Sequence, residues 1–160
     1  MSVTMKAMPL VASMLGNKLG IKVVIGSSDT AYTNGDTIFL PPLPVDDEGV
    51  LYPLVSGFID HEAAHIRHTD LGVLKGKMLT PAEKHLWNAI EDWRVEHEII
   101  KKYPGCREHF IWLIRHFFLH DADAETAGES ESPAFSVLNY VLLTLRSWDV
   151  PELVCNCELE

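Results

Sequence analysis

The five residues from His61 to His65 read His-Glu-Ala-Ala-His, which matches the H-E-x-x-H pattern of zinc enzymes. Residues four apart lie one turn apart on the same face of a helix, so both imidazoles can reach one ion. Glu62 lies about 100° further round the helix, where its carboxylate can take a proton from a water acidified by zinc. We therefore expect a Zn²⁺ site with His61 and His65 as ligands and Glu62 as the general base.

A helix expected to supply a third ligand has clear start and stop signals. Thr80 is a candidate N-cap, Pro81 takes the first helical position, and Glu83 completes a capping box. The helix should run to about Tyr103 and end before Pro104-Gly105, because proline cannot continue it. Its apolar stripe consists of Ala82, Leu86, Ala89, Ile90, Trp93 and Ile100.

Two acidic residues of this helix compete for the position of third ligand. Asp92 lies on the shoulder of the stripe and has Glu96 at i+4, placed to accept a hydrogen bond from a ligand histidine. Glu91 lies nearly opposite the stripe and has Val95 at i+4. We prefer Asp92 and keep Glu91 as the alternative. Either acid could also lie on a solvated face and pair with Arg94.

The other histidines are interpreted more modestly. His68 falls on the face of His61 and His65, and we expect it to support a ligand or simply to end the helix rather than to bind the metal. His116 and His120 also stand at i and i+4, but no Glu follows His116, so we interpret them as surface or core-edge residues.

The segment before these helices is predicted to form a small antiparallel sheet. Ile21–Ile25 is a β-branched run between two glycines. Asn34-Gly35, between Ala31–Thr33 and Thr37–Leu40, is a strong hairpin signal, because both turn residues tolerate positive φ. The strand Thr37–Leu40 ends at Pro41-Pro42, and prolines favour an edge position.

The remaining chain reads as mainly helical, so the expected class is α+β, with the metal between the HExxH helix and the helix after it. The segment Asp121–Ser132 carries five acids and no base and should be a solvated loop. Besides the helix at 80–103, helices are expected at Ala7–Leu15, at Leu54–Thr69 with Pro53 in its first turn, at Arg107–His120 and at Pro133–Trp148.

Composition limits the classes of function. The 160 residues fit a single domain with a helical C-terminal section at 106–160, and 47% apolar residues suffice for a packed core. The formal charge of −10 argues against nucleic-acid or anionic-membrane partners. No window approaches the ~18 apolar residues of a membrane span. Cys106, Cys155 and Cys157 form no disulfide framework, so we expect a cytoplasmic protein.

Three stretches together resemble a known group of proteins. They are Thr33–Pro41, which reads Thr-Asn-Gly-Asp-Thr-Ile-Phe-Leu-Pro, then His61–His68, and Leu86–Glu96, which contains Asn-Ala-Ile-Glu-Asp-Trp-Arg. The group is the zincin-like metallopeptidase domains of phage and bacterial cobaltochelatase CobT-like proteins. These domains usually precede a von Willebrand A domain, and they are commonly encoded beside a MoxR-type AAA+ ATPase. The resemblance covers roughly Lys18 to Phe110.

The resemblance implies a zincin-like fold and a zinc-dependent endopeptidase acting on polypeptides. In zincins an edge strand upstream of the HExxH helix binds the substrate backbone by strand addition, and Thr37–Leu40 is the candidate here. This chain lacks the Asp-x-Ser-x-Ser motif of a von Willebrand A domain, so we expect the N-terminal part of a longer protein or a stand-alone version. The terminal Leu-Glu could be a cloning scar. Unranked candidates for stabilising the oxyanion are Tyr52, His68, Arg94, His97 and Tyr103.

A second hypothesis belongs to another class of function. The domain could be a non-catalytic adaptor that presents proteins to a MoxR-type AAA+ ATPase and keeps zinc for structure. The presence of Glu62 favours catalysis, because a structural site has no need of that carboxylate. A structural site would also tend to be closed by a fourth protein ligand.

Overall fold

The structure, a computed structural model, describes residues 3–44, 47–70, 72–74, 76–120 and 133–156. It is α+β, with a small sheet and a mainly helical body, as the sequence predicts. In chain order the elements are α1 (Val3–Leu15), β1 (Lys22–Ile25), β2 (Tyr32–Thr33), β3 (Thr37–Leu40), α2 (Glu48–His68), α3 (Pro81–Lys102), α4 (Cys106–Arg115), the π-helical segment η1 (His116–His120), α5 (Pro133–Ser147) and the 3₁₀ helix η3 (Pro151–Asn156).

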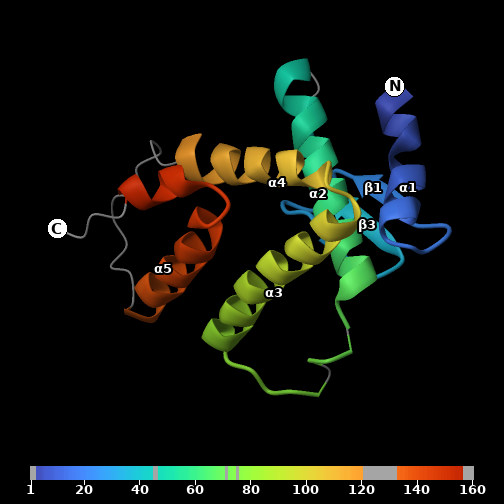
Figure 1. Cartoon of the computed structure of the whole chain (residues 1–160). Helices are drawn as coiled ribbons and strands as arrows, with labels where there is room; N and C mark the ends of the chain where they lie inside the picture. The colour runs from blue at the N-terminus through green and yellow to red at the C-terminus, as the bar shows by residue number, and fades with distance from the viewer. Residues whose placement is uncertain (1–2, 45–46, 71, 75, 121–132, 157–160) are drawn as a thin grey trace.

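Helix α2, which carries the His-Glu-Ala-Ala-His stretch, is the central element (Figure 1). It contacts α1, α3 and α4 and also strands β2 and β3, whereas α5 packs against α3 and η3. In Figure 1, α3 and α4 lie on one side of α2, while α1 and the sheet lie on the other. Within the HExxH stretch, Ala63 and Ala64 are fully buried, and their small side chains let these neighbours approach closely.

The three strands form a mixed sheet in the order β1-β3-β2. The predicted hairpin is confirmed, because β2 pairs antiparallel with β3, but β1 pairs parallel with β3. The prediction of a wholly antiparallel sheet is therefore wrong for β1. Thr37–Leu40 is the central strand and not an edge, with Ile38 and Leu40 fully buried. Pro41 and Pro42 follow this strand without entering it, so their missing N–H groups remove no ladder bond.

The turn of the hairpin is formed by the residues that predict it. The side-chain oxygen of Asn34 accepts hydrogen bonds from the backbone N–H groups of Asp36 and Thr37, at 3.0 and 2.9 Å. Gly35 has a φ of 94°, a conformation that a side chain would disfavour. Local chemistry alone therefore specifies the β2–β3 register.

Helix α2 begins at Glu48, before the predicted start at Leu54, because Asp47 caps it. The Asp47 side chain accepts hydrogen bonds from the N–H groups of Gly49 and Val50. Pro53 consequently lies in the second turn, where its missing N–H removes one helical hydrogen bond near the N-terminal end of the helix.

Helix α3 confirms the predicted boundaries. Thr80 accepts a hydrogen bond from the Glu83 N–H, and the Glu83 carboxylate accepts one from the Thr80 N–H, which is the predicted capping box. The helix ends at Lys102, before Pro104.

The C-terminal section differs from its prediction in detail. The helix expected at Arg107–His120 is α-helical only to Arg115 and continues as the π-helical segment η1. Helix α5 confirms the one expected at Pro133–Trp148, and η3 was not predicted. The expected loop Asp121–Ser132 and residue Cys157 lie outside the described residues. None of the helices in the described part of the chain is long and apolar enough to cross a membrane.

Helices α2 and α4 pack tightly against each other at Gly57. A Cβ atom added there would lie 2.5 Å from Cγ of Leu113, well inside van der Waals contact. The two helices carry neighbouring parts of the candidate site, so this contact fixes where α4 lies relative to His61.

We predict that Gly57→Ala destabilises the protein. Overpacking costs about 1–3 kcal/mol and outweighs the helix-propensity gain of about 1 kcal/mol. The free energy of unfolding, measured by urea titration, should fall. Gly105→Ala is the control, because a Cβ there meets nothing within 4 Å. Equal stability of Gly57→Ala and the wild type would show that Leu113 can move away freely.

Candidate metal centre

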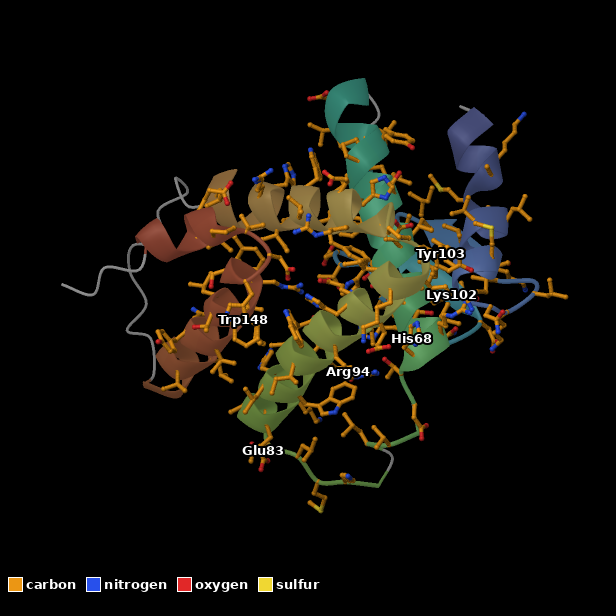
Figure 2. The ribbon with its side chains drawn as sticks, in the orientation of Figure 1. His68, Glu83, Arg94, Lys102, Tyr103 and Trp148 are labelled. Carbon is orange, nitrogen blue, oxygen red and sulfur yellow. The ribbon has the colours of Figure 1, made fainter. Side chains whose placement is uncertain are left out.

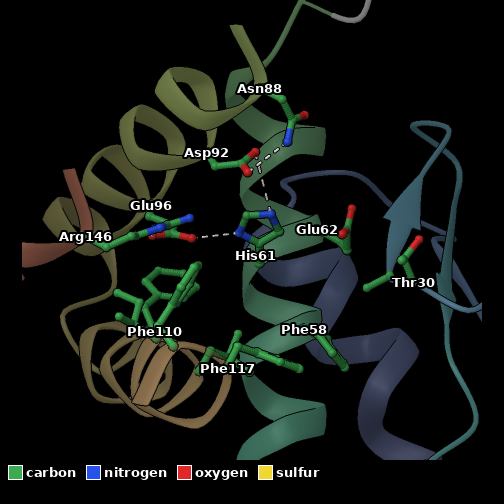
Figure 3. A pocket seen from close by; sticks show the side chains of 14 residues that line it. Thr30, Phe58, His61, Glu62, Asn88, Asp92, Glu96, Phe110, Phe117 and Arg146 are labelled. Atoms are coloured by element: carbon green, nitrogen blue, oxygen red, sulfur yellow. Dashed lines mark hydrogen bonds and ion pairs between the residues drawn. The ribbon is translucent and has the colours of Figure 1, made fainter. Parts of the chain in front are cut away.

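Three side chains from α2 and α3 converge on one point. Nε2 of His65 lies 3.0 Å from Oδ1 of Asp92. Nε2 of His61 lies 3.9 Å from the same oxygen (Figure 3). One ligand atom from each residue lies within 4.8 Å of the others. Zinc bonds of about 2.0–2.2 Å in a tetrahedral arrangement separate ligand atoms by roughly 3.3–3.6 Å. Two imidazole nitrogens and a carboxylate oxygen at these distances fit a divalent ion such as Zn²⁺.

The other ring nitrogen of His61 is held by Glu96, as the sequence predicts. Nδ1 of His61 lies 2.8 Å from Oε1 of Glu96, and the second oxygen of Glu96 accepts a hydrogen bond from Arg146 on α5. Burial opposes the charge on His61, but the hydrogen bond and charge of Glu96 outweigh it and raise the His61 pKa to about 9. Burial likewise opposes the charge on Glu96, yet Arg146 and His61 lower its pKa to about 2. Without a metal the two therefore form an ion pair, and metal binding must release a proton.

The other ring nitrogen of His65 is held through a hydroxyl group. Nδ1 of His65 lies 3.0 Å from Oγ1 of Thr69, and this hydroxyl donates to Oε1 of Glu91 at 2.7 Å. The carboxylate of Glu91 also accepts two hydrogen bonds from Arg94, at 2.7 and 2.8 Å. Glu91, the alternative third ligand, therefore lies behind His65 in an ion pair with Arg94, and Asp92 is the acid that lies beside both histidines.

Glu62 lies beside the cluster with its carboxylate inside the protein. Its residue is 4% exposed, and it lines the same cavity as His61 and Asp92 (Figure 3). Burial raises the pKa of Glu62, although His61 and His65 lower it in part. None of the hydrogen bonds found among the described residues involves its side chain, but its oxygens are not among the fully buried atoms that lack a partner, so they reach the cavity. A carboxylate with a raised pKa at the wall of a cavity is typical of functional sites, which favours a functional reason for its position.

The cavity beside the cluster measures about 300 Å³ and has two kinds of wall. The polar wall consists of His61, Glu62, Asn88, Asp92, Glu96 and Arg146. The apolar wall consists of Phe58, Phe110, Leu113, Ile114, Phe117 and Phe118, of which the last two come from the π-helical segment. Thr30 and Ala31, just before β2, line the cavity as well.

The charges around the cavity do not balance by themselves. Glu62, Asp92 and Glu96 provide three carboxylates, whereas Arg146 is the one guanidinium among the residues that line the cavity. With His61 protonated, as it is without a metal, one negative charge remains when all three carboxylates are ionised. A divalent cation that displaces the His61 proton would leave this group of residues without a net charge, which is compatible with such an ion.

The oxyanion candidates proposed from the sequence lie elsewhere. None of the five lines the cavity formed by the described residues. Arg94 is bound to Glu91 and to the backbone oxygen of His68 (Figure 2). Nδ1 of His97 bonds to the Trp93 carbonyl. The remaining candidates also have other surroundings: Tyr52 is 56% exposed, and Tyr103 donates to the Met14 carbonyl.

The remaining histidines take no part in the cluster. Nε2 of His68 is buried and has no hydrogen-bond partner among the described residues, so its expected role in supporting a ligand is not seen. The ring of His116 stacks on Trp112 at a centroid distance of 4.6 Å, in line with a core-edge position.

Sequence reasoning missed three residues that hold the cluster. Asn88 donates to the second oxygen of Asp92 at 3.0 Å, and it stands at i−4 from Asp92. Thr69 stands at i+4 from His65, so both had a helical spacing that could have identified them. The signal for Arg146 was weaker: it is the only charged residue of the otherwise neutral helix α5.

No protein-family model, curated protein or solved structure matches this chain.

We predict that Thr69→Val lowers the stability of the metal-free protein. Valine keeps the shape of threonine, but Nδ1 of His65 then loses its acceptor and Glu91 loses one donor. The free energy of unfolding in the presence of a chelator should fall by about 1–2 kcal/mol. Thr69→Ser, which keeps the hydroxyl, is the control. A Thr69→Val protein as stable as the wild type would show that this hydroxyl contributes nothing.

Proposed function

We propose that this protein is a zinc-dependent metallopeptidase. The observation that carries the proposal is the convergence of His61, His65 and Asp92 beside the buried, unbonded carboxylate of Glu62, at the wall of a cavity. By resemblance, we propose a zincin-like endopeptidase domain of the CobT-like group, acting in the cytoplasm and associated with a MoxR-type AAA+ ATPase.

The set of donors favours a catalytic site over a structural one. Among the described residues, three His, Cys, Asp or Glu side chains converge, and structural zinc sites typically have four. When bound there, Zn²⁺ would acidify a water molecule and polarise the scissile carbonyl group. The fourth position is then available to water and substrate.

Glu62 is placed to move the proton. It follows the ligand His61 directly and reaches the cavity from the same helix, so its carboxylate can accept a proton from the attacking water. The C–N bond then breaks, and Glu62 passes that proton to the leaving amine. The burial of Glu62 excludes bulk water, which would compete for the proton.

The strand that would bind substrate is β2, which replaces the earlier candidate. Thr37–Leu40 is hydrogen-bonded on both sides, by β1 and β2, so it has no free edge. The two residues before β2, Thr30 and Ala31, line the cavity. Thr30 lies opposite Glu62 (Figure 3). An extended peptide adding to the edge of β2 would pass Glu62 with one side chain toward the aromatic wall, so apolar residues should be favoured there.

The adaptor hypothesis has weaker support from the geometry. An adaptor with structural zinc would need neither the buried carboxylate of Glu62 nor the cavity beside it. Activity of a Glu62 variant separates the two hypotheses.

We predict about one zinc per chain, with Asp92 rather than Glu91 as the third ligand. Asp92→Ala should weaken zinc binding by more than about 100-fold, whereas Glu91→Ala should cost about 10-fold or less, since it acts through Thr69. His61→Ala and His65→Ala should abolish stoichiometric zinc. Competition titration with a chromophoric chelator measures all four affinities. Loss of zinc binding in Glu91→Ala, together with wild-type zinc affinity in Asp92→Ala, would instead identify Glu91 as the third ligand.

We predict that Glu62→Gln keeps zinc and fold but loses peptide hydrolysis, because an amide cannot accept the proton. The rate should fall by about 10²–10⁴. Cleavage of unfolded casein and of a peptide library is measured for both proteins, with and without a chelator and with the associated ATPase added.

Chelator-sensitive cleavage at equal rates in Glu62→Gln and the wild type would refute this mechanism. If neither protein cleaves any substrate even with the ATPase, the adaptor hypothesis is favoured instead.

A further inference from the structure

His61 is connected through Glu96 to helix α5. The residue of α5 that makes this connection, Arg146, lies 50 residues beyond Glu96 in the chain. His61 on α2 contacts Oε1 of Glu96 on α3 at 2.8 Å, and Oε2 of Glu96 accepts a hydrogen bond from Arg146 on α5. The three residues thus join three helices in one line (Figure 3). Glu96 and Arg146 are 5% and 7% exposed, so solvent contributes little to holding either side chain.

Packing alone does not explain why a charged pair stands here. Two apolar residues of similar volume would dock α5 on α3 without the cost of desolvating two charges, and such replacements are often neutral or stabilising. The pair has a geometric use instead. With one oxygen held by Arg146, the other oxygen of Glu96 is aimed at Nδ1 of His61. That contact keeps the proton on Nδ1 and leaves Nε2 facing Asp92.

A chain of hydrogen bonds lies behind each histidine and ends at an arginine, but only one of the two arginines is buried. Behind His65, Thr69 and Glu91 lead to Arg94, whose side chain is 42% exposed. Behind His61, the arginine is buried and comes from a distant part of the chain. Only the His61 side therefore makes the metal ligands depend on the docking of α5.

We propose that Arg146 is a positioning residue of the metal centre: it orients the Glu96 carboxylate that holds His61, so that docked α5 is required for tight metal binding. This inference rests on the proposed function, because it concerns the same metal site. The helical C-terminal section then helps to hold the metal site in place, through the contact of Arg146 with Glu96.

The test compares metal binding among arginine variants. In Arg146→Gln, zinc affinity measured by chelator competition should fall by about 10–100-fold, the usual range for losing a partner behind a ligand. The visible spectrum of the Co²⁺-loaded protein should change, since His61 is no longer fixed. Arg146→Lys should recover part of the affinity, because an ammonium restores the charge but not the fixed planar shape of the guanidinium.

Two further proteins separate positioning from simple stability. Arg115→Gln removes an exposed ion pair with Glu152 in the same section and should leave zinc affinity and the Co²⁺ spectrum unchanged. In a Glu96→Gln background, adding Arg146→Gln should change zinc affinity by less than about 3-fold, because Arg146 acts through Glu96. If Arg146→Gln does not fold, the Arg146→Lys protein in both backgrounds gives the same comparison.

Wild-type zinc affinity and an unchanged Co²⁺ spectrum in folded Arg146 variants would overturn the inference while leaving the metal site intact. An equally large loss in the Glu96→Gln background would also overturn it, since Arg146 would then act by another route. Absence of zinc binding by the wild type is a different result, which would refute the proposed function and this inference together.

Discussion

The contact between α2 and α3 brings two histidines of one helix against two carboxylates of the other. His61 and His65 stand at i and i+4 on α2, and Asp92 and Glu96 stand at i and i+4 on α3. His61 meets Glu96 and His65 meets Asp92, so the two helices run in opposite directions where they touch. Four polar side chains in one helix contact are unfavourable unless each finds a partner or an ion. Asn88 of α3, Thr69 at the end of α2 and Arg146 of α5 supply those partners.

The partners differ in how they stabilise the two helices. Asn88 and Thr69 are local, each four residues from the side chain that it supports, so they need only a formed helix and its end. Arg146 is not local, and its contact with Glu96 exists only when α5 is docked. Removal of one member of that pair would leave a buried charge without compensation, an effect much larger than that of a lost surface ion pair. The proposed metal ligands are thus supported locally on one side and by tertiary structure on the other.

The same division between local and distant interactions explains what the sequence could predict. The Asn34-Gly35 hairpin, the Thr80 capping box and the i, i+4 placement of Glu96 behind Asp92 are local patterns, and the structure contains all three. The parallel pairing of β1 with β3 and the docking of Arg146 depend on how distant segments meet, which no local pattern specifies. Thr37–Leu40 is the central strand although prolines follow it, because Pro41 and Pro42 lie after its last residue and leave its hydrogen bonds to both neighbours intact.

The residues of the candidate site come from two parts of the chain. One part lies inside the stretch from Lys18 to Phe110 that the resemblance covers, and the other lies beyond it. His61, Glu62 and Asp92 lie within the stretch from Lys18 to Phe110, whereas Leu113, Ile114, Phe117, Phe118 and Arg146 lie beyond it and still line the same cavity. The first part contains the donors and the buried carboxylate, which are what bond hydrolysis needs. The second part contains most of the apolar wall and the arginine behind Glu96, and under the proposed function these would affect which substrate side chain is accepted and how firmly His61 is held. A change beyond Phe110 would then alter selectivity or metal affinity without touching a proposed ligand, because the two parts share one cavity.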